Sequence, residues 1–161
     1  MYESLVDGVG VRATIFISGC SHNCKGCHNP KTQNYKNGKE FTLELQQKII
    51  NKIKSNSLIK GITLSGGDPM FSAREVIDFV QLAKSQLENI NVWCYTGFTF
   101  EEIMNSGDTD KIKLLKLCDV IVDGKFIEKQ RDVTLKFRGS RNQRVIDVKR
   151  SFDKNQAIEL Y

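Results

Sequence analysis

Residues 13–27 read ATIFISGCSHNCKGC, an apolar strand-like run that leads directly into a loop with three cysteines. The alternation of β-branched and aromatic residues over 13–18 predicts a buried strand. Cys20, Cys24 and Cys27 follow it with the spacing Cys-x3-Cys-x2-Cys. A short loop that holds three thiols at the end of a buried strand indicates a metal site.

The chain on either side of this stretch alternates between strand-like and helical segments. Strands are expected at residues 61–64, 91–95, 118–122 and, less regularly, 144–148, and helices at 42–55, 72–87, 99–105 and 111–116. Thr42 is the expected cap of the first helix, and the pairs Ser72/Glu75 and Thr99/Glu102 are expected capping boxes. This alternation predicts an α/β fold with a parallel sheet and right-handed crossovers. A complete eight-fold barrel needs about 250 residues, so we expect a partial (open) parallel β/α barrel, as a single domain over residues 1–161.

Chemically distinctive residues follow the ends of the expected strands. The cysteine loop follows the first strand, 65–69 (SGGDP) the second, 95–97 (YTG) the third and 123–125 (DGK) the fourth. In parallel sheets, ligands bind beyond the carboxyl ends of the strands. The sequence therefore predicts one binding rim there.

Composition limits the class of protein. The net charge is a mild +5, from 24 basic and 19 acidic residues, and three of the five cysteines lie within eight positions. This cysteine usage favours a reducing cytoplasm and a metal site over a secreted disulfide protein. We expect no secretory signal, no membrane span and no nucleic-acid partner. The basic residues between Lys125 and Arg150 are either a solvated surface or a docking face for an anionic ligand or an acidic partner.

The donor set of the cysteine loop leaves two kinds of site open. Three thiolates can hold three irons of a cubane cluster and leave the fourth iron open, whereas ordinary electron-transfer clusters use four cysteines. The alternative is a zinc site of three cysteines and one histidine, with His22 a more plausible fourth ligand than His28. The remaining cysteines, Cys94 and Cys118, lie in apolar strands and are expected to pack in the core.

The cysteine loop after the first strand resembles the motif of radical S-adenosylmethionine enzymes. In that family the open iron binds the amino and carboxylate groups of S-adenosylmethionine, and the resemblance implies a barrel of the same type. Gly26 stands where the family commonly has an aromatic residue, so the adenine contact usually assigned to that side chain is weakened. The expected contact to adenine is then made by the backbone of residues 26–28.

The motifs after the other strands extend this resemblance. Ser65-Gly66-Gly67-Asp68 is similar to the family's glycine-rich motif, which binds the amino group, although a plain turn would read the same way. Asp123 and Lys125 resemble an Asp-x-Lys element that meets the ribose or carboxylate; a solvated turn is the alternative. The resemblance implies the following cofactor-binding residues beside the three cysteine ligands: Gly26, Cys27, His28, Ser65, Gly66, Gly67, Asp68, Asp123 and Lys125.

Further segments resemble the glycyl-radical activating enzymes, and among them those that act on anaerobic ribonucleotide reductase. These segments are 6–12 (VDGVGVR, with Val9 in place of a proline), 27–30 (CHNP), 95–98 (YTGF), 122–126 (VDGKF) and 137–144 (FRGSRNQR). The resemblance implies a 4Fe-4S cluster, S-adenosylmethionine, a flavodoxin-like electron donor, and a radical placed on a glycine of the large subunit of anaerobic ribonucleoside-triphosphate reductase. In this mechanism the cofactor carries out the chemistry, so no side chain has to act as a catalytic acid or base.

Three alternatives remain at this point. The chain could activate another glycyl-radical enzyme, such as a pyruvate formate-lyase. It could also be an iron–sulfur carrier or a zinc-binding module without enzymatic activity. Arg138 and Arg141 could serve either a docking face or the cofactor pocket.

Overall fold

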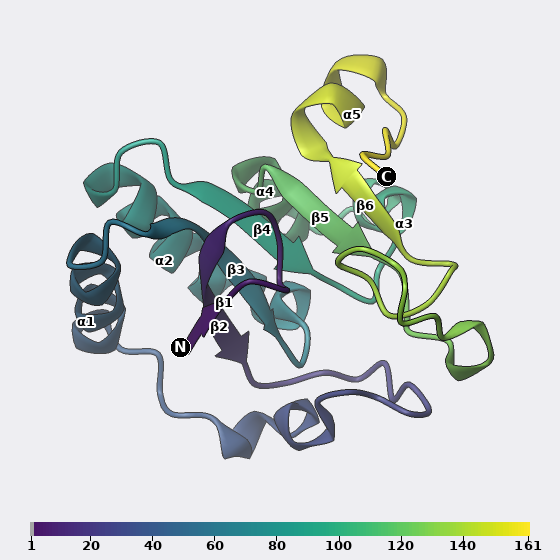
Figure 1. Cartoon of the computed structure of the whole chain (residues 1–161), viewed down its shortest axis with the longest axis horizontal. Helices are drawn as coiled ribbons and strands as arrows, with labels where there is room; N and C mark the ends of the chain where they lie inside the picture. The colour runs from purple at the N-terminus through teal and green to yellow at the C-terminus, as the bar shows by residue number, and fades with distance from the viewer. Residues whose placement is uncertain (1) are drawn as a thin grey trace.

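The computed structural model describes residues 2–161, and its centre is one six-stranded sheet whose strands lie in the order of the chain (Figure 1). The strands are β1 (Tyr2–Ser4), β2 (Val11–Ile17), β3 (Ile59–Gly66), β4 (Asn91–Tyr95), β5 (Val120–Asp123) and β6 (Arg144–Asp147). The four strands from β2 to β5 are parallel, as the sequence predicts. The α/β class is thereby confirmed.

The two edge strands differ from the sequence-based expectation. β6 pairs with β5 in the antiparallel direction, with Asp123 opposite Arg144, and β1 pairs antiparallel with β2. A parallel pair needs a crossover that returns the chain to the starting end of the sheet. The segment between β5 and β6 instead contains a 3-10 turn (Glu128–Gln130) and an antiparallel bridge between Arg131 and Ser140, and its residues form no α-helix, so β6 begins at the end of the sheet where β5 ends. β1 is three residues long, too short for a periodic pattern to reveal it.

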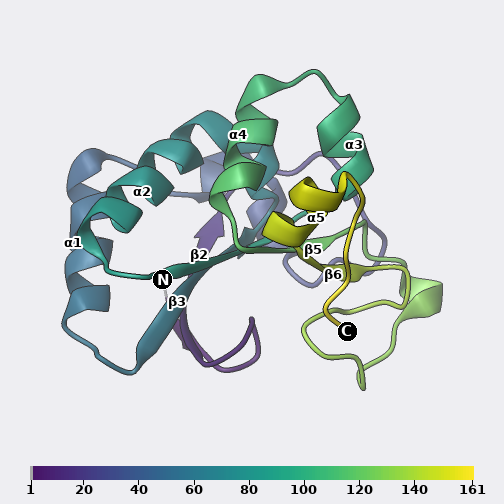
Figure 2. The same ribbon diagram turned by 90° about the horizontal axis from the view of Figure 1, so that it is seen from above.

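The α-helices lie on one face of the sheet (Figure 2). They are α1 (Leu43–Lys54), α2 (Ala73–Gln86), α3 (Phe100–Asn105), α4 (Thr109–Leu117) and α5 (Val148–Lys154). Short 3-10 turns occur at Pro30–Gln33, Tyr35–Asn37 and Pro69–Ser72. Among residues 2–161, none of the helices combines the length and the apolar character needed to cross a membrane.

The main core lies between the sheet and these helices. Alternate strand residues such as Ile62, Leu64 and Ile121 pack against helix residues such as Val80 and Leu114, and all five are fully buried. Cys94 and Cys118 belong to the same core, which confirms their expected packing role. Burying such side chains stabilises the fold by about 1.5–3 kcal/mol each.

Two of the three predicted helix caps are confirmed. The Thr42 side chain accepts from the amide of Leu45, and Thr99 and Glu102 form a complete capping box. The capping box predicted at Ser72 is wrong, because the Ser72 side chain makes no capping hydrogen bond. Ser72 instead ends the 3-10 turn that runs directly into α2, so the chain is already turning before the α-helix begins.

The opposite face of the sheet is crossed by one buried arginine, Arg12 of β2. Its guanidinium donates to the Thr63 hydroxyl at 2.6 Å and to backbone oxygens of Ile62 at 2.6 Å and Asn91 at 3.1 Å, and it lies 5.2 Å from the centroid of the Trp93 ring. Burial lowers the pKa of Arg12 to about 10, so the group stays charged at neutral pH. Arg12 therefore ties β2, β3 and β4 together on the face that carries no helices.

Candidate functional site

A cavity of about 640 Å³ lies at the carboxyl ends of the parallel strands. Residues that follow each of the four parallel strands line it, together with the loop after β1 and the segment 133–139 before β6. The expected residues that line it are Cys20, Cys24, Cys27, His28, Ser65, Gly66, Gly67 and Lys125. The structure thus gathers most of the residues expected at the rim around one space.

The three cysteines of the loop all face this cavity. They are free thiols of intermediate exposure, and the loop starts with hydrogen bonds from the amides of Gly19 and Cys20 to the carbonyls of Thr32 and Gln33, at 2.7 and 3.0 Å. Burial raises the pKa of the Cys20 thiol above its ordinary value of 9.0, although the amide of His22 opposes the rise.

The donor set fits a cluster of several irons. Among residues 2–161, no three His, Cys, Asp or Glu side chains are close enough together to hold a single metal ion. In a cubane, each cysteine binds a different iron, so three ligands need not converge on one point. Three thiols that line one cavity, with open space beside them, suit such a cluster.

The glycine loop packs directly against the start of the cysteine loop. The amide of Gly67 donates to Ile17 at 2.8 Å, and the amide of Asp68 donates to Gly19 at 2.9 Å. A Cβ at Gly67 would lie 2.5 Å from the Gly19 oxygen and 2.6 Å from the Thr32 oxygen. Gly67 is therefore required by the packing of the protein itself, whether or not a ligand also approaches it.

Asp68 is not among the residues that line the cavity, and the protein itself supplies its hydrogen-bond partners. Its side chain is 1% exposed and accepts hydrogen bonds from four protein donors. These donors are the amides of Met70 (2.9 Å) and Gly97 (2.8 Å), the Thr96 hydroxyl (2.9 Å) and Nε2 of His22 (2.8 Å). The carboxylate is therefore used to join loops, and His22 has a partner other than the zinc considered above.

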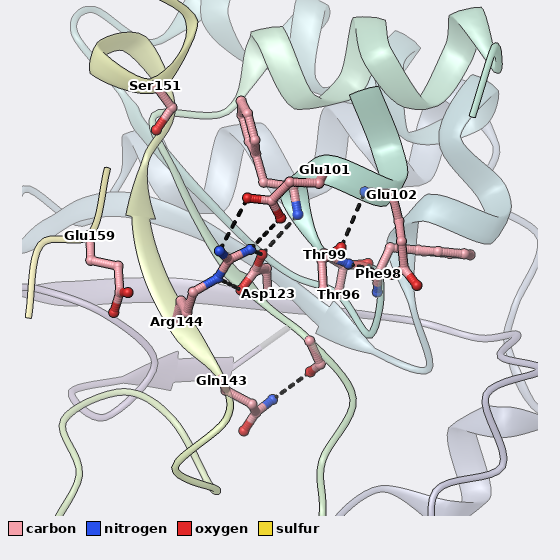
Figure 3. A network of polar contacts seen from close by, with 12 residues as sticks. Thr96, Phe98, Thr99, Glu101, Glu102, Asp123, Gln143, Arg144, Ser151 and Glu159 are labelled. Carbon is pink, nitrogen blue, oxygen red and sulfur yellow. Dashed lines mark hydrogen bonds and ion pairs between the residues drawn. The ribbon is translucent and has the colours of Figure 1, made fainter. Parts of the chain in front are cut away.

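The Asp123 side chain is likewise held by groups of the protein. Its carboxylate is fully buried, does not line the cavity, and accepts from Nη2 and Nε of Arg144 at 2.6 and 3.1 Å and from the amide of Phe100 at 2.8 Å (Figure 3). Arg144 also contacts Glu101 at 2.6 Å. These contacts raise the pKa of Arg144, through Asp123 first, and Arg144 lowers the pKa of Glu101. Lys125, two residues further on, does line the cavity.

Gly26 is the third expected residue that does not line the cavity. Its backbone has φ of 73°, and a Cβ there would lie 3.0 Å from the Glu128 carboxylate and 3.4 Å from the Phe126 ring. This glycine therefore turns the loop beside the segment after β5. His28, two residues on, faces the cavity.

The structure also separates Arg138 from Arg141. Arg138 lines the cavity and donates to the Gln143 carbonyl at 2.9 Å, while its Nε is buried and has no hydrogen-bond partner among residues 2–161. Arg141 is largely exposed and pairs with Asp132 at 3.1 Å. Only Arg138 is placed to act within the cavity.

Sequence reasoning gave no site role to two parts of the lining. These are Leu5, Val6 and Asp7 after β1, and the residues Val133, Leu135, Lys136, Phe137 and Gly139 before β6. The first part follows the antiparallel strand β1 and the second lies several residues beyond the end of β5, so the strand-end rule does not find them. The available signals were the resemblance of segments 6–12 and 137–144 to known enzymes, which covers part of this lining, and the basic residues after Lys125, which include Lys136.

Comparison with known proteins identifies the family. The family model described as "4Fe-4S single cluster domain" matches residues 6–146. Proteins named anaerobic ribonucleoside-triphosphate reductase-activating protein are similar over most of the chain. The one from Vibrio cholerae is 42% identical over 86% of this chain and 89% of its own length. Those from Haemophilus influenzae and Escherichia coli are 39% and 35% identical over 86% of this chain and 89% and 90% of their own lengths. The chain therefore belongs to the family of anaerobic ribonucleoside-triphosphate reductase-activating proteins, with a 4Fe-4S single cluster domain.

Proposed function

We propose that this protein is a radical S-adenosylmethionine enzyme that activates anaerobic ribonucleoside-triphosphate reductase by creating a glycyl radical on its large subunit. The observation that carries the proposal is the cavity in which three free thiols face a glycine loop. Relatives that cover most of the chain are named activators of that reductase, which supports the partner. On this proposal the open sheet is the partial barrel of the radical enzymes, formed by a single domain that works in the cytoplasm.

Within the cavity, Cys20, Cys24 and Cys27 would hold a 4Fe-4S cluster, and its chemistry would be the one-electron cleavage of S-adenosylmethionine, fed by a flavodoxin-like donor. The backbone of residues 65–67 and His28 borders the same space and would orient the cofactor. Lys125, Lys136 and Arg138 add positive charge to the lining, which suits a carboxylate. Asp68, Asp123 and Gly26 lie outside the lining, so we assign them to holding the loops.

A protein substrate suits the mouth of this cavity. Leu5, Val6 and Val133 line it and yet are 71%, 74% and 82% exposed. Apolar side chains that are exposed together at the edge of a pocket commonly mark a contact surface. We propose that the reductase covers them, and that Arg141 and other exposed basic residues steer its approach through charge.

The test starts with the cluster. Protein reconstituted without oxygen should bind about four irons and four sulfides per chain. Cys20→Ala, Cys24→Ala and Cys27→Ala should each lose nearly all of this iron, because each removes one ligand. Cys94→Ala is the matched control, since Cys94 lies in the core, and it should keep the iron. Stoichiometric zinc without iron would contradict the proposal.

The second step identifies the reaction and the partner. Dithionite-reduced protein should cleave S-adenosylmethionine, measured as 5′-deoxyadenosine, and should produce a glycyl-radical signal in electron paramagnetic resonance when mixed with the reductase. A carrier or zinc protein would not cleave the cofactor. Cleavage together with activation of pyruvate formate-lyase, but not of the reductase, would transfer the assignment to that enzyme class.

A further inference from the structure

One buried carboxylate joins the ends of three parallel strands. Asp68 follows β3, and its two oxygens accept from donors in its own loop, in the loop after β4 and in the cysteine loop after β2. The donor from the cysteine loop is Nε2 of His22, at 2.8 Å. A carboxylate only accepts, so Nε2 of His22 carries the proton in this contact.

The surroundings of His22 fix its ring in this position. Its side chain is 7% exposed and packs against Phe71 and Phe98, with ring centroids at 5.1 and 4.6 Å. The absence of a side chain at Gly97 provides the space, because a Cβ there would collide with the imidazole. Packing and hydrogen bonding therefore select the same ring orientation.

His22 also lies at the centre of the proposed ligand loop. It is two residues from Cys20 and two residues from Cys24, and its own amide interacts with the Cys20 sulfur. The backbone bonds of the loop hold its start, through Gly19 and Cys20, and its end, through the amide of Cys27 and the carbonyl of Cys24. The His22 ring supplies the contact that fixes the middle of the loop to the sheet.

We propose that His22 and Asp68 are a positioning pair that holds the cysteine loop in its metal-binding shape before any metal is present. The inference rests on the proposed function for the identity of the cluster, but the ordering of the loop is a property of the protein alone. Holding ligands in place before the metal binds reduces the conformational entropy lost on binding. Neither residue touches the reacting atoms in this assignment.

The experiment compares three variants with the unmodified protein. His22→Ala removes the contact, and His22→Gln keeps an N–H donor that can reach Asp68. Gly97→Ala displaces the ring without changing either partner. Hydrogen exchange of residues 19–28 in the metal-free protein measures loop order directly, and iron uptake at limiting iron and sulfide measures its consequence.

We expect exchange over residues 19–28 to become about tenfold faster in His22→Ala, since a buried hydrogen bond to a charged group is lost. Exchange in β3 to β5 should stay unchanged, and iron uptake should fall several-fold. Gly97→Ala should reproduce these effects, and His22→Gln should recover most of the protection. His28→Ala is the matched control, because the second histidine of the chain is not bonded to Asp68 and its loss should leave the exchange of residues 19–24 unchanged.

Unchanged exchange and iron uptake in His22→Ala would overturn the inference. So would a His22→Gln protein as impaired as His22→Ala, because packing alone would then explain the loss. If His22→Ala fails to fold, His22→Gln and Gly97→Ala decide the question. A wild-type protein that binds no iron would refute the proposed function, whereas the exchange measurement would still test the pair.

Discussion

Two carboxylates that the sequence places at the rim, Asp68 and Asp123, have similar positions and different partners. Asp68 lies just after β3 and Asp123 is the last residue of β5; each is at most 1% exposed, and neither lines the cavity. Asp68 accepts from two amides, a hydroxyl and a histidine, whereas Asp123 binds the guanidinium of Arg144 and one amide. The contacts of Asp68 join the loops after β2, β3 and β4, and the contacts of Asp123 fix β6 and the start of α3 to the end of β5.

The difference teaches that a carboxylate beside a glycine or lysine motif can hold different parts of the protein together, depending on the donors that surround it. Asp68 satisfies several donors at the strand ends, so its loss should affect the shape of the cysteine loop. Asp123 balances the charge of Arg144 at the β6 edge of the sheet. Its loss should therefore lower stability without changing the shape of the cysteine loop. Three predictions separate these roles.

Replacing Asp68 should have the largest effect. Asp68→Ala leaves the buried amide of Met70, the partly buried amide of Gly97 and the buried Thr96 hydroxyl without their acceptor, and each unsatisfied group costs about 1–3 kcal/mol. We expect the free energy of unfolding of the metal-free protein to fall by about 4 kcal/mol in urea titrations. Exchange over residues 19–28 should also accelerate. A loss below about 1 kcal/mol would show that water replaces these bonds at little cost.

Replacing Asp123 should cost less. Asp123→Ala removes one partner of Arg144, and breaking a buried pair in this way costs about 3–5 kcal/mol. Arg144 keeps Glu101 and its side chain is 26% exposed, so we expect about 3 kcal/mol. Exchange over residues 19–28 should stay at the wild-type rate. Acceleration there equal to that in Asp68→Ala would remove the distinction between the two carboxylates.

Replacing Glu101 should have the smallest effect on the free energy of unfolding, and this effect should depend on pH. Arg144 lowers the pKa of Glu101 below its ordinary value of 4.5, so this pair stabilises the fold above that pH and loses its effect as the pH falls through the lowered pKa. Because Glu101 is half exposed, Glu101→Gln should cost less than about 1 kcal/mol at pH 6. The difference from wild type should shrink as the pH falls below 4.5 and through the lowered pKa of Glu101, measured by urea unfolding.

A control separates this pair from a general loss of charge. Glu88→Gln removes one carboxylate from an exposed position after α2. At pH 6, Glu88→Gln should lower the free energy of unfolding by less than Glu101→Gln does. Equal costs for both variants would attribute the effect to net charge instead of the contact with Arg144.

The sequence predicts the parts of this fold that depend on local pattern. The strand at Asn91–Tyr95 has the predicted bounds, and the Thr99/Glu102 box forms because both residues act within one helical turn. The sequence also brings the cysteines and glycines to one rim, because parallel strands share an end. The direction of β6 depends on how the segment 124–143 folds back, which no local pattern encodes.

The same reasoning applies to the two carboxylates at the rim. A motif shows which residues are near a ligand, but the direction of each side chain depends on donors far away in the sequence. Asp68 turns toward Thr96, 28 residues on, and Asp123 turns toward Arg144, 21 residues on. Pairings of this kind become visible only when the loops are placed in three dimensions.

The order of the strands in the sheet has a consequence for synthesis of the chain. Since β1 to β6 are neighbours in the order of the sequence, each strand that leaves the ribosome finds its partner already made. The contact of His22 with Asp68 can be completed once Gly97 has emerged, whereas the cavity wall formed by residues 124–139 is made later. We therefore expect the cysteine loop to assemble first during synthesis, while one side of it is still open, and the cavity to close over it last.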